Sequence, residues 1–84
     1  MTYKLSILRK AQKQLAKLPA GDYKKVKQTI LDLAKNPRPA GALKLKGRDG
    51  WRVRQGNYRI IYEIHDKQLI ITVLDVGDRK EIYR

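Results

Sequence analysis

Apolar and polar residues follow two different periods along this 84-residue chain. Residues 3–7 (YKLSI) alternate, which is typical of a strand because successive strand side chains point to opposite faces. Apolar residues then recur every three or four positions through residues 8–18 and again through residues 23–34, which predicts two amphipathic helices. The break at Pro19-Ala20-Gly21 is short, so the helices should form an antiparallel hairpin, with Asp22 as the N-cap of the second.

The second half of the chain changes to the strand period after the loop at residues 36–42. Strands are predicted at residues 43–46, 51–55, 58–65 and 68–76, which are rich in Ile, Val, Leu and Tyr. Gly56-Asn57 and Asp66-Lys67 are typical of tight turns between strands. The order β-α-α-β-β-β-β predicts an α+β fold within a single domain, residues 1–84. The N-terminal strand and the helical hairpin should pack on one face of a mostly antiparallel, twisted sheet.

The Gly56-Asn57 turn also predicts which residues share a face. A two-residue turn pairs Trp51 with Tyr62 and places Arg54 directly opposite Arg59. The predicted core face holds Trp51, Val53, Ile60, Tyr62, Ile64, Leu69, Ile71 and Val73. The other face holds Arg52, Arg54 and Arg59, together with Ile61, Glu63, Ile70, Thr72 and Leu74.

Like charges directly opposite each other destabilise a sheet, so this pairing needs a reason. An anion between the arginines would supply one, because the guanidinium fork matches a phosphate group bidentately. The alternative is a solvated sheet face on which the arginine stems cover apolar neighbours.

The composition of the chain limits the kinds of partner that the protein is expected to bind. Twenty Lys and Arg against eight Asp and Glu give a net charge of +12 and a pI near 10.2, which is typical of a nucleic-acid-binding domain. An acidic protein partner or an anionic lipid surface could use the same charge. The chain has no cysteine and no apolar run long enough for a signal peptide or a membrane span. We therefore expect a cytoplasmic protein with no membrane partner.

The reactive residue types point to one class of chemistry. His65 is the only histidine and lies beside a predicted turn, and the acidic residues have no metal-ligand spacing, so no metal and no small-molecule cofactor is expected. Arg, Lys and Tyr suit RNA cleavage by the 2′-OH, which needs positioning and charge stabilisation more than a protein nucleophile. Besides the arginines, Lys44, Lys46 and Arg48 are predicted to contact RNA. Near the C-terminus, Tyr83 suits either a base-stacking residue or an anchor for the tail.

Two segments resemble a known family. W-R-V-R-x-G-x-Y-R-I-I-Y-E-I at residues 51–64 and V-x-x-V-G-x-R-x-x-x-Y at residues 73–83 resemble RelE-type toxins of the RelE/ParE toxin–antitoxin superfamily. The resemblance implies a RelE-like domain over nearly the whole chain. It also implies a toxin of a type II toxin–antitoxin system, which cuts mRNA in the ribosomal A site through the 2′-OH without a metal and so inhibits translation. A cognate antitoxin, expected here to be acidic and partly disordered, would neutralise it.

The resemblance also implies roles for individual residues. Arg52 and Arg54 match the two basic residues of the first catalytic strand, and Arg59 matches the arginine that stabilises the phosphate. Arg79 matches the proposed acid for the leaving 5′-oxygen, and Tyr83 the tyrosine that stacks on the substrate. Well-known members carry lysine at the positions of Arg52 and Arg54. Because arginine keeps its proton, we assign both to charge stabilisation, and the proton acceptor is left open between Tyr83, a ribosomal group and water.

Two further functions fit the same residues. A ParE-like relative would poison DNA gyrase and cleave no RNA. A non-catalytic RNA-binding module would bind RNA with a steep salt dependence and no turnover.

Overall fold

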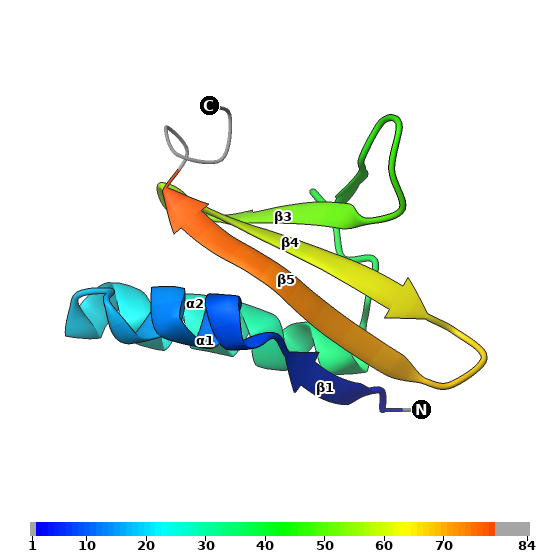
Figure 1. Cartoon of the computed structure of the whole chain (residues 1–84), viewed down its shortest axis with the longest axis horizontal. Coiled ribbons are helices and arrows are strands. Elements are labelled where there is room, and N and C mark those ends of the chain that lie inside the picture. Colours follow the sequence, from blue (N-terminus) through cyan, green and yellow to red (C-terminus); the bar gives the residue numbers. More distant parts are fainter. Residues whose placement is uncertain (1, 79–84) are drawn as a thin grey trace.

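The computed structural model describes residues 2–78 and confirms the predicted order of elements. They are β1 (Lys4–Ile7), α1 (Arg9–Ala16), α2 (Ala20–Lys35), β2 (Leu43–Lys44), β3 (Trp51–Gln55), β4 (Tyr58–His65) and β5 (Ile70–Asp78). The strands form one five-stranded sheet in the order β1-β5-β4-β3-β2. Only β1, which is parallel to β5, departs from antiparallel pairing within this sheet. Both helices lie on one face of the twisted sheet, as an α+β fold requires (Figure 1).

The first hairpin has the predicted register. Trp51 pairs with Tyr62 and Arg54 with Arg59, and Gly56 takes a φ of 60°. A positive φ is what the two-residue hairpin turn demands of its first central residue, and glycine adopts it without a Cβ clash. The turn chemistry therefore determines which side chains of β3 and β4 face the helices.

The second hairpin differs from the prediction. The turn spans residues 66–69 and not only Asp66-Lys67, so β5 begins at Ile70. Leu69 was predicted in the strand and lies in the turn with a φ of 56°, a left-handed conformation that is uncommon for leucine. Because the turn is longer by an even number of residues, Ile71 and Val73 still face the core as predicted, and both are fully buried.

A β-bulge in β5 was not predicted. Tyr62 pairs with Val73, but the preceding residue, Ile61, pairs with Asp75, so Leu74 is an extra residue in β5. In a regular strand Asp75 would face the core and Val76 would not. The bulge reverses this alternation, which buries Val76 and turns Asp75 to the outer face.

The start of the second helix also differs from the prediction. α2 begins at Ala20, and the residue in the N-cap position is Pro19, so Asp22 is not the N-cap and lies in the first turn. A carboxylate there still interacts favourably with the helix dipole. Its Oδ2 atom accepts a hydrogen bond of 2.9 Å from the Tyr58 hydroxyl, which ties α2 to the first hairpin.

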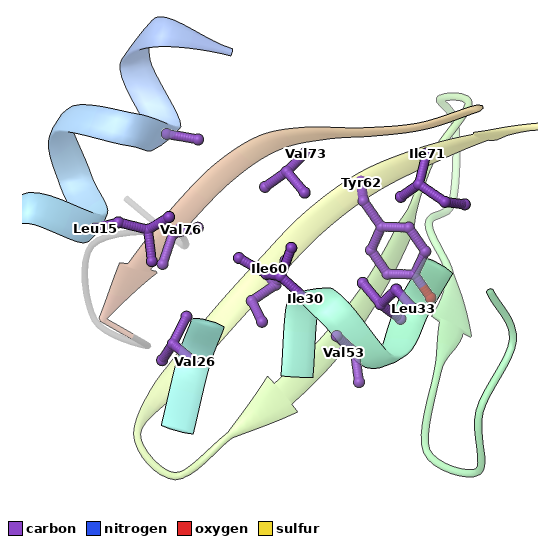
Figure 2. Packing of buried hydrophobic residues seen from close by; sticks show 11 residues of the cluster. Leu15, Val26, Ile30, Leu33, Val53, Ile60, Tyr62, Ile71, Val73 and Val76 are labelled. Atoms are coloured by element: carbon purple, nitrogen blue, oxygen red, sulfur yellow. The ribbon is translucent and has the colours of Figure 1, made fainter. Parts of the chain in front are cut away.

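Tyr62 is the largest fully buried side chain of the core between helices and sheet (Figure 2). Around it lie apolar side chains from α2, β3, β4 and β5, among them Leu33, Ile60 and Ile71. The Tyr62 hydroxyl donates a 2.7 Å hydrogen bond to the carbonyl oxygen of Pro37, which satisfies the polar end of the ring. Burial raises the pKa of Tyr62 from 10.0 to about 12.

A polar cluster holds the loop after α2 against the far end of the sheet. Asp66 accepts hydrogen bonds from Arg38 (2.9 Å) and from the Tyr3 hydroxyl (2.6 Å), and the Arg38 guanidinium lies 5.3 Å from the centre of the Trp51 ring. The Arg38 hydrogen bond, followed by that of Tyr3, lowers the pKa of Asp66. The cluster therefore joins the N-terminus, the loop, β3 and the second turn. None of the helices in residues 2–78 has the length and apolar character to cross a membrane.

The Tyr62→Phe variant tests the buried hydroxyl. It should lose about 1 kcal/mol of unfolding free energy at neutral pH, because the Pro37 carbonyl loses its donor. The folded-state pKa of Tyr62 lies above the usual value of 10.0, so its contribution to stability is complete below pH 10 and is lost as the pH rises toward about 12. Urea unfolding across this range should show a steeper loss of stability in the wild type than in the variant. Parallel losses in the two proteins would contradict the assignment.

Candidate active site

The arginine cluster lies on the outer face of the sheet, which is the face turned away from α1 and α2. Arg54 is paired with Arg59, and Arg52 with Ile61 in the same register. On the other side of β4, Arg59 is paired with Gly77 of β5. The structure thus brings Arg52, Arg54 and Arg59 onto one face, as the two-residue turn predicts.

The arginines of this cluster differ sharply in burial. Arg54 is exposed, Arg52 is half-buried, and Arg59 is only 2% exposed. The partner of Arg59 in β5 is Gly77, which has no side chain. Arginine stays protonated at any working pH, and a charge acts more strongly where water is excluded. Arg59 therefore places a buried positive charge on the strand next to that of the exposed Arg54, at the position paired with it.

The turn that carries Arg54 and Arg59 is anchored to α2 on both sides. Tyr58 follows the turn and donates to Asp22, and Thr29 of α2 donates a 3.0 Å hydrogen bond to Oε1 of Gln55 before the turn. The hydrogen bond to Asp22 is the main cause of a raised Tyr58 pKa. Sequence reasoning missed this anchor because it assigned Asp22 to the N-cap. A small hollow of about 30 Å³ lies at the turn, lined by Arg54, Gly56, Asn57, Tyr58 and Arg59.

A larger depression of about 530 Å³ adjoins Arg52, and we call it the trough. It is lined by Leu8, Lys10, Leu45, Arg48, Arg52, Ile61, Leu74 and Asp75. Its residues come from the start of α1, from the loop between β2 and β3, and from the outer face of β3, β4 and β5. Sequence reasoning placed Arg52, Ile61 and Leu74 on this face. It missed Leu8, Lys10 and Asp75, which the α1 position and the bulge bring there.

The basic residues predicted to contact RNA divide between two sides of the sheet. Arg48 is exposed and lines the trough beside Arg52. Lys46 is exposed in the same loop. Lys44 pairs with Trp51, which puts it on the side away from the arginines, and it lines a separate hollow of about 310 Å³ with Trp51 and Arg38. The structure therefore joins Arg48, but not Lys44, to the arginine face.

Two predicted site residues, Arg79 and Tyr83, lie outside the described residues. His65 lies at the end of β4, with its Nε2 atom 3.5 Å from Oε1 of Glu63. Within residues 2–78, no three His, Asp or Glu side chains are grouped so that they could hold a metal ion. The described part of the site thus consists of arginines on a strand pair, with the trough beside them.

Comparison with known proteins shows the family to which this chain belongs. A family model described as the ParE toxin of type II toxin–antitoxin systems (parDE) matches residues 5–83. The chain is also 30% identical to the mRNA interferase toxin RelE of Escherichia coli K12. The alignment is 88 residues long and covers 99% of this chain and 92% of that protein.

Solved structures agree. A chain of the toxin–antitoxin complex RelBE2 from Mycobacterium tuberculosis matches with a TM-score of 0.84 and 26% identity, covering 94% of this chain and 93% of that one. A chain of the archaeal RelE–RelB complex from Pyrococcus horikoshii matches with a TM-score of 0.80 and 30% identity, covering 94% and 97%. This chain therefore belongs to the RelE/ParE superfamily and is a RelE-type toxin of a type II toxin–antitoxin system.

Proposed function

We propose that this toxin is an endoribonuclease that cleaves mRNA in the ribosomal A site and so inhibits translation. The observation that carries the proposal is the direct pairing of Arg54 and Arg59 on the outer face, one exposed and one buried. Such a pairing costs stability in the free protein and favours binding of a bridging phosphate. The name of the Escherichia coli relative, an mRNA interferase, supports the same reaction.

The chemistry assigned to the site is in-line attack by the substrate. The 2′-oxygen attacks the adjacent phosphorus, the bond from phosphorus to the 5′-oxygen breaks, and the products are a 2′,3′-cyclic phosphate and a 5′-hydroxyl. The proton of the 2′-OH passes to an acceptor, and the 5′-oxygen receives a proton. Arg54 and Arg59 hold the phosphate and stabilise the charge that develops on its oxygens, while Arg52 extends this field along β3. No metal ion enters this scheme, because the RNA itself supplies the nucleophile.

Outside the described residues, the proposal assigns Arg79 as the acid for the 5′-oxygen and Tyr83 as the residue that stacks on a base. The arginines of β3 and β4 keep their protons and do not serve as the base. Arg48, which is exposed and lines the trough with Arg52, and Lys46, which is exposed in the same loop, are assigned to phosphates of mRNA or ribosomal RNA.

The partner proposed for the free toxin is a cognate antitoxin, acidic and partly disordered before it binds. Chains similar to this one occur in the solved RelBE2 toxin–antitoxin complex of Mycobacterium tuberculosis and the RelE–RelB complex of Pyrococcus horikoshii. A net charge of +12 favours an acidic chain that orders on the toxin surface.

A second candidate function is the poisoning of DNA gyrase that is expected of a ParE-like relative, and the matching family model is described as the ParE toxin. A surface that binds only protein has no need of two directly opposed arginines, so we favour the nuclease.

The cleavage reaction is tested by adding the purified protein to an in vitro translation system and mapping cut sites by primer extension. We expect cuts within the A-site codon and little cleavage of free mRNA. Arg54→Ala should lower the cleavage rate about 10²- to 10³-fold, which is the usual loss when one group that stabilises the transition state is removed. Lys24→Ala, which removes one exposed charge from α2, should cleave at the wild-type rate. Arrest of translation without cuts, or trapped gyrase–DNA complexes, would overturn the nuclease proposal.

The cost of the arginine pairing has its own test in the Arg54→Glu variant. A carboxylate opposite Arg59 replaces a repulsive pair by an attractive one, so the unfolding free energy should rise by about 0.2–1 kcal/mol at low salt. Inorganic phosphate should stabilise the wild type more than this variant. Lys67→Glu changes the net charge equally from an exposed position in the turn after β4 and serves as the control. If both variants gain the same stability, the effect comes from net charge and not from the pairing.

A further inference from the structure

We propose that the trough beside Arg52 binds one base of the RNA and that Asp75 selects guanine there. The inference rests on the proposed function, because it places the base next to the phosphate held by the arginines. Lys10, Arg48 and Arg52 put positive charge around the trough, and Leu8, Leu45, Ile61 and Leu74 line it with apolar surface. Among the described residues that line it, Asp75 is the one carboxylate. This combination suits a nucleotide: cations for the phosphates, apolar side chains against the base and an acceptor for its edge.

Asp75 is held in a defined orientation. The Gln14 side chain donates a 2.6 Å hydrogen bond from Nε2 to Oδ1 of Asp75, and its Oε1 atom accepts a 2.8 Å hydrogen bond from the backbone N–H of Val76. Lys10 forms a 3.1 Å ion pair with Oδ2 of Asp75. The Asp75 side chain remains 28% exposed. An ionised carboxylate has about four acceptor positions, so these two donors leave acceptor capacity for a ligand.

The bulge is what brings this carboxylate to the trough. The extra residue, Leu74, turns Asp75 to the outer face and also adds its own side chain to the lining. Bulges commonly re-aim side chains next to active sites. A carboxylate on the face proposed to bind a polyanion repels phosphate, so a ligand group that lies against Asp75 has to donate hydrogen bonds.

Leu8 is a second indication of a ligand. It occupies the N-cap position of α1, makes no capping hydrogen bond with its side chain and is 44% exposed. Ser, Thr, Asp or Asn at this position would stabilise the helix. Leucine instead adds apolar surface to the rim of the trough, which suits a partner with a flat apolar face.

Leu45 lines the trough from the loop between β2 and β3. Its backbone N–H donates a 3.0 Å hydrogen bond to the carbonyl oxygen of Gly50, which closes the loop. Gly50 has a φ of +148°, and a Cβ there would lie 3.2 Å from Cδ1 of Leu45. Glycine thus allows the close approach that holds Leu45 in place.

The edge chemistry selects the base. Guanine presents two neighbouring donors, N1–H and N2–H, which a carboxylate accepts as a pair. Adenine and cytosine each present one donor beside an acceptor, and uracil presents one donor between two carbonyl oxygens. If adenine, cytosine or uracil lay opposite Asp75, a lone pair of the base would face a negatively charged carboxylate oxygen. A site built for two donors discriminates strongly against such bases.

The test measures binding of uncleavable trinucleotides, with a 2′-deoxy sugar at the scissile position, to the full-length protein by NMR at low salt. We expect the trinucleotide with guanine to bind more tightly than the one with adenine by about 10- to 100-fold, with inosine, which lacks the N2 donor, in between. Asp75→Asn should abolish this preference. Asp49→Asn, at an exposed carboxylate outside the trough, should keep it.

Equal binding of all bases by the wild type, no binding of any trinucleotide, or an equal loss for every base in Asp75→Asn would overturn the inference. The last result would show that Asp75 only ties α1 to the sheet. Because this assay uses no ribosome, it separates the two proposals. A guanine preference without A-site cleavage would contradict only the proposed function, and A-site cleavage without a guanine preference would contradict only the role of the trough.

Leu8→Ser gives an independent test, because it should raise the stability of the protein and lower its affinity for the guanine trinucleotide. Serine supplies the missing N-cap, so the urea midpoint of unfolding should rise. The same change removes apolar surface from the rim, so the affinity for the guanine trinucleotide should fall several-fold. An unchanged affinity in a stabilised variant would show that Leu8 does not contact the base.

Discussion

The two-residue turn at Gly56-Asn57 is the constraint on which the rest of this structure depends. Its length pairs Trp51 with Tyr62 and Arg54 with Arg59. A turn longer by one residue would shift the alternation of one strand and exchange its core and outer residues. The core around Tyr62 and the arginine face are therefore two consequences of one register. The hydrogen bonds from Tyr58 to Asp22 and from Thr29 to Gln55 hold the turn against α2 and so preserve that register.

This register places two like charges opposite each other, which is unfavourable for stability, and one of the two arginines is buried. A permanently charged guanidinium lies at 2% exposure, directly across the strand pair from another arginine. Burial of a charge costs free energy, and the neighbouring charge adds to that cost. The same arrangement makes the positive field at this point strong and pre-oriented. In the proposed function, a bridging anion between Arg54 and Arg59 would reduce the repulsion between them.

The sequence predicts the parts of this molecule that depend on local chemistry. Hairpin residues and period-two alternation suffice for the register of β3 and β4, and for the confirmed core positions of Val53, Ile60 and Tyr62. Features decided by tertiary contacts are missed. Leucine has little propensity for the left-handed turn conformation that Leu69 adopts. No residue type in β5 predicts the bulge at Leu74. The trough could not be predicted either, because the bulge and the side chain of Gln14 together place Asp75 there.

The protonation states of the arginine face limit what it can do alone. In the proposed reaction, Arg52, Arg54 and Arg59 are assigned to stabilising negative charge, and guanidinium groups in general do not serve as bases. A lysine at such a position could lose its proton when its environment lowers its pKa. In the proposed reaction this chain therefore separates two tasks that lysine can combine. Its strands supply binding and charge stabilisation, and the proton of the 2′-OH must pass to another group of the toxin, to the ribosome or to water. Under this proposal the net charge of +12 favours binding of RNA, whereas the rate of cleavage depends on which of these acceptors lies beside the 2′-OH.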